Sequence, residues 1–156
     1  MSDNRNINFY GQNNPYGQFS NFYQAAFTDS ENRKWKTTEH YFQAMKFEEH
    51  PEHFGAVQNA STPGASAKMG RSRQRPLRPD WEEVKDGIMM DALRYKFTQH
   101  QDLKDILMST GGKKLVEHTR NDRYWGDGGD GGGKNMLGVL LMQLRDEFKE
   151  NRGDQL

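Results

Sequence analysis

Residues 37–47 read Thr-Thr-Glu-His-Tyr-Phe-Gln-Ala-Met-Lys-Phe, and this stretch predicts the helix around which the chain is organised. A threonine at either of the first two positions can cap the free N–H groups, and Glu39 suits the positive end of the helix. With 100° of rotation per residue, Glu39, Gln43 and Lys46 fall within about 60° of one another, on one stripe. Two interpretations fit. Either a largely buried helix presents these groups to a pocket, or an ordinary amphipathic helix carries a pair bridged by glutamine.

The composition favours a single folded domain with no overall charge. The 156 residues include 22 Lys and Arg against 22 Asp and Glu, so no global field attracts nucleic acid or an anionic membrane. Nine Phe, six Tyr and three Trp argue against disorder. The absence of cysteine excludes disulfides, thiolate nucleophiles and zinc–thiolate sites. Without a signal peptide or a membrane-length apolar run, we expect a soluble, cytoplasmic protein.

Local patterns predict a mainly α fold with a minor β part; α+β is the alternative. The domain is expected to span 1–156, with a core at about 7–148 and loose ends at 1–6 and 151–156. The predicted elements are a strand at 7–10, a hairpin of 25–28 with 33–36, helices at 37–47, 80–100, 102–108 and 136–150, and a short strand at 114–118. Two histidines flank Pro51, but the proline disrupts the helical pattern and no third ligand follows. A solvated loop is therefore expected there, and no metal site.

A run of cations follows in a stretch without any acid between positions 53 and 79. Its members are Lys68, Arg71, Arg73, Arg75 and Arg78. Such a run is either a solvated face or a phosphate site, where arginine can make bidentate contacts. Gly70 lies inside the run and would let the backbone approach a ligand closely. Nucleic-acid binding is the competing interpretation, which the zero net charge disfavours.

A second unusual segment has six glycines among the nine residues 126–134. A flexible linker would not carry Tyr124 and Trp125 before it and two aspartates within it. Its spacing fits neither a Walker loop nor a dinucleotide-binding loop. The remaining interpretation is that the glycines let the backbone of this segment approach a ligand closely.

Several polar and aromatic residues have no evident role in packing, and together they are suited to one kind of reaction. They supply carboxylates, a lysine, cations for phosphate and aromatic planes for a base. Cleavage of a bond between ribose and a nitrogenous base passes through an oxocarbenium-like state that a carboxylate stabilises. Residues 19–23 form another aromatic cluster, interpreted as core packing or as a ligand contact through Asn21.

Four motifs together resemble one family. They are Glu-His-Tyr-Phe-Gln-Ala-x-Lys-Phe at 39–47, Phe-Ser-Asn-Phe at 19–22, the Met-Gly-Arg to Asp-Trp stretch at 69–81, and Tyr-Trp-Gly-Asp-Gly-Gly running into Leu-Gly at 124–138. In this order they are similar to the NADAR, or YbiA-like, family of small N-glycosidases. The resemblance covers roughly residues 7–148.

The resemblance implies hydrolysis of the N-glycosidic bond in phosphoribosylamino-pyrimidine intermediates of riboflavin synthesis. One alternative is release of ADP-ribose from modified guanine, as in other branches of the family. A second is a non-catalytic ADP-ribose or nucleotide-binding module. The expected partner is thus a phosphoribosyl or ADP-ribosyl small molecule, with nucleic acid only as an ADP-ribosylated substrate and no membrane; the oligomeric state stays open.

Three residues are predicted to be catalytic. Glu39 would stabilise the developing positive charge or activate water. Lys46, desolvated between Phe42 and Phe47, would have a lowered pKa and attack the sugar C1 to form a Schiff base; its alternative role is to pair with Glu39. Asp127 would be the second carboxylate or bind the ribose hydroxyls.

The predicted substrate-binding residues are Asn21, Phe22, Trp35, Gln43, Gly70, Arg71, Arg73, Arg78, Trp81, Trp125, Gly126, Gly128 and Asn135. Among them, Trp81 or Trp125 would stack on the base, and Arg71 with Arg73 or Arg78 would hold the phosphate. No cofactor or metal is required. Glu39, Asp127 and Asp130 could gather Mg²⁺, but direct carboxylate catalysis ranks first.

Overall fold

The computed structural model describes residues 6–154, with side chains described up to residue 152. Within this range the chain contains six α-helices and four short strands, so the predicted mainly α fold with a minor β part is confirmed. The chain divides into two compact units, residues 21–99 and residues 1–20 with 100–156. None of the helices in the described part of the chain is long and apolar enough to cross a membrane.

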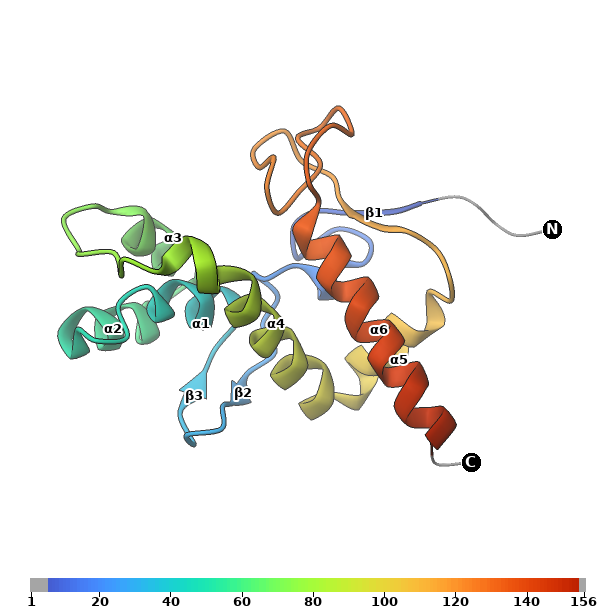
Figure 1. Ribbon diagram of the computed structural model, residues 1–156, viewed down its shortest axis with the longest axis horizontal. Coiled ribbons are helices and arrows are strands. Elements are labelled where there is room, and N and C mark those ends of the chain that lie inside the picture. Colours follow the sequence, from blue (N-terminus) through green and yellow to red (C-terminus); the bar gives the residue numbers. More distant parts are fainter. Residues whose placement is uncertain (1–5, 155–156) are drawn as a thin grey trace. The chain divides into compact units, whose positions relative to one another are not determined.

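The unit of residues 21–99 is built around the central helix (Figure 1). Its elements are β2 (Phe27–Thr28), β3 (Lys34–Trp35), α1 (Thr38–Met45), α2 (Pro51–Gln58), α3 (Pro63–Arg71) and α4 (Trp81–Gln99). The two strands pair antiparallel, as the predicted hairpin requires. Helix α1 packs against α2, α3 and α4, which places it at the centre of this unit.

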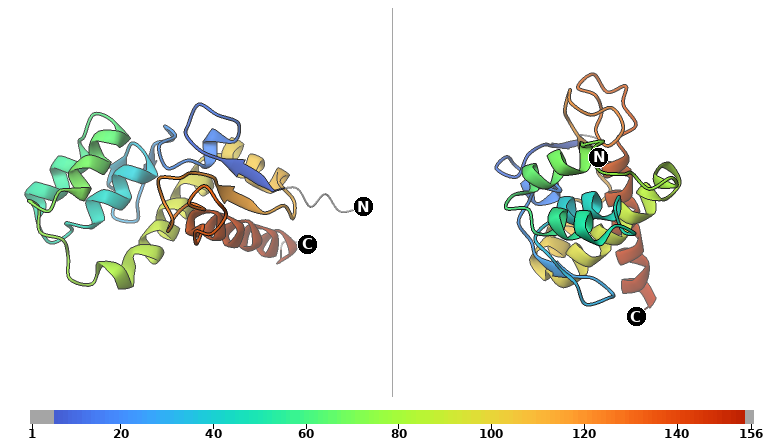
Figure 2. Two further views of the ribbon diagram at one scale, coloured as in Figure 1. Left: turned by 90° about the horizontal axis from the view of Figure 1, so that it is seen from above. Right: turned by 90° about the vertical axis from the view of Figure 1, so that its left-hand side faces the viewer.

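The other unit combines a two-stranded parallel sheet with two helices. Its elements are β1 (Ile7–Phe9), the 3₁₀-helix η1 (Gly17–Phe19), α5 (Gln101–Ser109), β4 (Leu115–Glu117) and α6 (Met136–Asp154). Ile7 lies opposite Leu115 in the register of β1 and β4. Figure 2 shows the two strands side by side, and α6 packs against β4.

Helix α1 forms as its sequence predicts. Thr37 is extended, and its Oγ1 accepts a hydrogen bond from the backbone N–H of His40 at 3.1 Å, which caps the helix. Every residue of α1 is buried. The side chain of Glu39 lies in the first turn, near the positive end of the helix dipole.

The structure differs from the predicted elements at three places, one of which is α3 (Pro63–Arg71), a helix that the sequence patterns do not predict. The solvated loop expected at His50–His53 is wrong, because Pro51 is the first residue of α2, where its fixed φ and missing N–H cost nothing. Helix α6 continues to Asp154, so residues 151–154 are helical, in place of the loose end expected after about Glu150. The loose ends expected at 1–5 and 155–156 lie outside the described residues.

Candidate active site

The polar stripe of α1, defined by Glu39, Gln43 and Lys46, is buried. The exposed fractions of these residues are 9%, 5% and 8%. Nε2 of Gln43 donates a hydrogen bond to Oε1 of Glu39 at 3.0 Å. The burial expected of the stripe is thus confirmed, and the alternative of an ordinary amphipathic helix is wrong. Burial of two ionisable groups on one helix is costly, which is typical of a functional site.

Lys46 lies in an environment that favours the neutral amine. Its Nζ donates to the carbonyl of Gly70 at 3.3 Å and lies 5.6 Å from the ring centroid of Trp81 and 5.9 Å from that of Phe42. The pKa of Lys46 is lowered from 10.5 to about 8, mainly by burial and next by the charge of Arg73, while the charge of Glu39 acts in the opposite direction. The predicted desolvation is confirmed, with Trp81 lying over the amine where the sequence suggested Phe47.

The run of cations separates into residues with and without acidic partners. Arg78 makes two hydrogen bonds to Asp80, at 2.6 and 3.0 Å, and one to Glu48 at 3.3 Å, and these contacts raise its pKa. These contacts favour a structural role for Arg78 at the start of α4 over the predicted phosphate contact. Arg71 and Arg73 form no ion pair within the described range, and a guanidinium N–H of Arg73 donates to the Gly70 carbonyl. Both arginines therefore keep donors for an anion near Lys46.

The predicted aromatic contacts fall into different environments. Trp35 is 1% exposed and its indole N–H donates to Asp29 at 2.9 Å, which favours a core role over the predicted ligand contact. Trp81 packs on Phe42 with ring centroids 4.9 Å apart and is 6% exposed. Phe22 is 37% exposed, and its predicted ligand contact stays a prediction.

Asn21 is tied to the first turn of α1. Its backbone carbonyl accepts from the N–H of Glu39 at 3.2 Å, and its side-chain oxygen accepts from the hydroxyl of Thr38 at 2.8 Å. The side-chain oxygen therefore helps to anchor the helix start. A ligand contact through its amide nitrogen stays a prediction.

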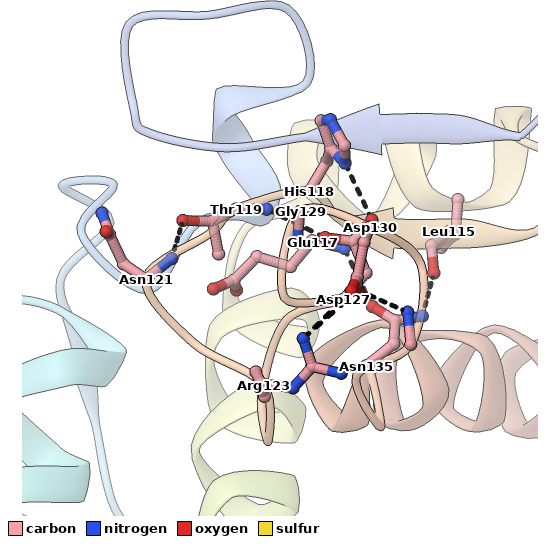
Figure 3. A network of polar contacts seen from close by, with 11 residues as sticks. Leu115, Glu117, His118, Thr119, Asn121, Arg123, Asp127, Gly129, Asp130 and Asn135 are labelled. Carbon is pink, nitrogen blue, oxygen red and sulfur yellow. Dashed lines mark hydrogen bonds and ion pairs between the residues drawn. The ribbon is translucent and has the colours of Figure 1, made fainter.

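In the other unit, the glycine-rich loop of residues 118–135 is organised by Asp127 (Figure 3). Oδ1 of Asp127 accepts from the backbone N–H of Thr119 at 3.1 Å and of Gly129 at 2.8 Å, and Oδ2 lies 2.7 Å from Nδ1 of His118. Burial alone would raise the pKa of Asp127, but these hydrogen bonds, with that of His118 the strongest, bring it below its ordinary value. The carboxylate is thus ionised and engaged by the loop itself.

The other predicted residues of this loop also support its shape. Asn135 has a left-handed backbone, φ 52°; its Nδ2 donates to the carbonyl of Leu115 and its Oδ1 accepts from the N–H of Glu117, both at 2.9 Å. Gly128 has φ 75°, and a Cβ on Gly126 would lie 2.9 Å from the Glu117 carbonyl oxygen. The backbone N–H of Trp125 donates to Asp122 at 2.9 Å, and its side chain is partly exposed. This loop is ordered by its own hydrogen bonds, so the flexible-linker interpretation is wrong.

Two features were missed from the sequence. His118 follows the short strand β4, and no sequence pattern links it to Asp127. The close approach of Gln43 to Gly70 joins residues of α1 and α3 that are far apart along the chain. No group of three His, Asp or Glu side chains that could hold a metal ion occurs in residues 6–152.

The site around α1 and α3 contains a buried carboxylate, an amine of lowered pKa and two arginines without acidic partners. Such a set is suited to breaking a bond at a sugar carbon, with the cations facing a phosphate. The mainly α fold with this site defines an enzyme of the glycosidase type.

Comparison with known proteins agrees with this class. Residues 8–149 match the NADAR domain, so the chain belongs to the NADAR family. It is similar to the N-glycosidase YbiA of Escherichia coli, at 51% identity over 91% of this chain and 88% of the relative. The NMR structure of E. coli YbiA superposes with a TM-score of 0.87 at 46% identity, covering 97% of this chain and 89% of that one.

Two further relatives extend the comparison. The N-glycosidase Npun_R5314 of Nostoc punctiforme is 39% identical over 92% of each chain. The chloroplastic riboflavin biosynthesis protein PYRR of Zea mays is 40% identical over 91% of this chain, which corresponds to 25% of that longer protein. The family resemblance expected from the four motifs is confirmed, and the chain is a hydrolase acting on N-glycosyl compounds.

Proposed function

We propose that the chain hydrolyses the bond between ribose phosphate and an amino-pyrimidine base in early intermediates of riboflavin biosynthesis. The observation that carries the proposal is the buried stripe of α1, where the Glu39 carboxylate lies one helical turn from Gln43 and two from an amine of lowered pKa. The names of the relatives support the substrate, since one is a riboflavin biosynthesis protein and two are N-glycosidases.

The chemistry assigns separate tasks to the two ionisable groups. The free amine of Lys46 attacks C1 of the sugar, the bond from C1 to the base nitrogen breaks, and the base leaves with a proton. The amine nitrogen is now bonded to C1 and has given one proton to the leaving base. Opening of the sugar ring breaks the bond from C1 to the ring oxygen, which takes the second proton of the amine, and an imine forms. Water hydrolyses this imine, which returns the amine and releases ribose phosphate. Glu39 stabilises the positive charge that develops at C1 in both steps. In the alternative pathway, Glu39 activates water directly and Lys46 is its structural partner.

The phosphate is assigned to Arg71 and Arg73. Both lie close enough to Lys46 to lower its pKa through their charge, and neither is paired with a carboxylate in the described part of the chain. Guanidinium groups in this situation can make bidentate contacts with a phosphate. The partner of the protein is therefore a phosphoribosyl small molecule, and we expect the reaction to take place in the cytoplasm.

The first test incubates the protein with the phosphoribosylamino-pyrimidine and follows release of ribose 5-phosphate. Glu39→Gln should lose turnover, because the neutral amide cannot stabilise a cation. Glu52→Gln serves as the matched control, since Glu52 is an exposed carboxylate on α2. Intact substrate with wild-type protein would contradict the proposal, and cleavage of ADP-ribosylated guanine in a parallel assay would support the other family activity.

A further inference from the structure

Gln43 is the one member of the buried stripe whose chemistry the proposed reaction does not use. Its amide is 5% exposed, and the Nε2 group is committed to Glu39 at 3.0 Å. Its Oε1 is fully buried and has no hydrogen-bond partner within the described range. A buried carbonyl oxygen without a donor is unfavourable, so its retention calls for a reason.

The neighbour of that oxygen is Gly70, near the end of α3. A Cβ built on Gly70 would lie 1.8 Å from Oε1 of Gln43, 2.7 Å from its Cδ and 3.0 Å from its Cβ. Gly70 does not have a positive φ, so its backbone conformation would accept any residue. What requires glycine here is therefore space: the amide of Gln43 occupies the volume that a side chain would fill.

The orientation of the amide follows from the charge of Glu39. If the amide were reversed, its oxygen would face a carboxylate oxygen and two acceptors would meet. With the observed orientation, the N–H donates to Glu39 and the oxygen rests on Gly70 without a partner. A protonated Glu39 could also donate to the amide oxygen and so permit the reversed orientation, whereas an ionised Glu39 permits only the observed one. The ionised state is the one needed to stabilise a positive charge.

The same glycine also contacts the other charged groups of the site. Its carbonyl accepts from Nζ of Lys46 at 3.3 Å and from the guanidinium of Arg73. Gly70 thus fixes the amide through its missing side chain and orients two cations through its carbonyl.

We propose that Gln43 is a positioning residue for Glu39, held in one amide orientation by the absence of a side chain at Gly70. It acts through Glu39 and does not itself bind the substrate. This role differs from the substrate contact that the sequence predicts for Gln43. The inference rests on the proposed function for its kinetic consequences, but the packing arrangement is testable without turnover.

The kinetic test is a double-mutant cycle with Gln43→Ala and Gly70→Ala. Each single variant should lower kcat about 10- to 100-fold with KM changed less than about threefold, because a misplaced catalytic group loses alignment in the transition state. Since both substitutions remove the same hydrogen bond, the double variant should be no slower than the slower single variant. Additive losses would overturn the proposal.

Two further variants complete the cycle. Adding Gln43→Ala to Glu39→Gln should cause no additional loss of kcat, whereas a Gln43 that binds substrate directly would still contribute. Gly87→Ala is the matched control, because Gly87 lies inside α4 and a Cβ there meets nothing within 4 Å. It should leave kcat and KM unchanged.

The structural test uses NMR signals of the Gln43 side-chain amide in protein without substrate. We expect these protons to be protected from exchange in the wild type and in Gly87→Ala, and to lose protection in Gly70→Ala and in Glu39→Ala. Unchanged signals in Gly70→Ala would refute the positioning role, whatever the activity. If the amide protons lose protection in Gly70→Ala but the wild type cleaves neither substrate, the packing arrangement would stand and the proposed function would be rejected.

Discussion

Two buried carboxylates of the chain, Asp127 and Glu39, differ in their hydrogen bonding. In the glycine-rich loop, both oxygens of Asp127 accept hydrogen bonds from the loop itself, two of them from backbone N–H groups. In the α1 polar stripe, Glu39 accepts a hydrogen bond from the side chain of Gln43, and burial lowers the pKa of the Lys46 amine on the same stripe. Backbone N–H donors fix the Asp127 carboxylate within its own loop, whereas burial of a carboxylate and an amine on one helix is costly and typical of a functional site.

This difference favours α1 as the site of the proposed reaction and a structural task for the loop. Asp127 was predicted from the sequence to be catalytic, and that assignment stays a prediction. The contacts of its carboxylate favour holding the turn around Gly129, which has φ 86°. Substitutions at matched positions in the two regions can separate these roles.

The largest effect is expected for Glu39→Gln. Loss of the negative charge beside the sugar should lower kcat by about 10³-fold, within the range found when a group that stabilises transition-state charge is removed. KM should change little, because the carboxylate acts mainly in the transition state. Steady-state kinetics at saturating substrate measure this, with circular dichroism as a check on folding. A variant within threefold of wild type would remove Glu39 from the mechanism.

The next largest effect is expected for Lys46→Met. If the amine is the nucleophile, kcat should fall by about 10²-fold or more. In the wild type, kcat should rise with pH through about 8, because the neutral amine forms as pH passes the lowered pKa. Borohydride added during turnover should link the sugar to Lys46, detected by mass spectrometry. Turnover without trapping, and with a flat profile near pH 8, would favour the structural role of Lys46.

Stability offers an independent check of the same pKa. The folded-state pKa lies below the unfolded value of 10.5, so between about pH 8 and 10.5 the unfolded chain binds more protons at this site. The free energy of unfolding should therefore gain from Lys46 as pH rises through that window. Lys96, whose pKa burial lowers to about 7, contributes with the same sign, so the difference between wild type and Lys46→Met isolates the effect.

Sequence alone predicted α1 well, because capping and helical periodicity are local. Thr37 caps the helix and the three polar residues share one stripe, as expected from 100° per residue. The pairing of Gln43 with Gly70 was out of reach, since it depends on how α3 packs on α1. Composition also could not distinguish the core position of Trp35 from the position of Trp81 over Lys46, because both are large aromatic residues between polar ones.

Proline and aspartate show a second limit of sequence analysis. From the sequence, Pro51 is predicted to break a helical pattern, whereas in the structure it starts α2, and both roles agree with its restricted backbone. The partners of Asp127 are mostly backbone N–H groups, which every residue except proline carries, so no side-chain pattern reveals them. Whether a carboxylate is engaged or available is a property of the folded loop.

Arg73→Gln is expected to have an intermediate effect. Loss of a phosphate contact should raise KM about tenfold with kcat reduced less. Because the charge of Arg73 lowers the pKa of Lys46, this pKa should be higher in the variant. The increase of kcat with pH should then occur at a higher pH. Arg75→Gln is the matched control: Arg75 donates to Nδ1 of His53 at 2.7 Å, and it is not among the charges that shift Lys46. Equal effects of the two variants would reject a specific phosphate contact.

The smallest effect on activity is expected for Asp127→Asn. The amide keeps one acceptor for the loop but places an N–H₂ group or a weaker acceptor toward His118, which should cost about 1–3 kcal/mol of the free energy of unfolding. For a chain of this size the midpoint temperature should fall by roughly 2–10 °C. At a temperature where the variant is fully folded, kcat should stay within about threefold of wild type. A loss near that of Glu39→Gln in a stable protein would reverse the comparison: Asp127 would then be a catalytic carboxylate whose bonds to Thr119 and Gly129 serve to keep it ionised and aimed, as Gln43 is proposed to do for Glu39.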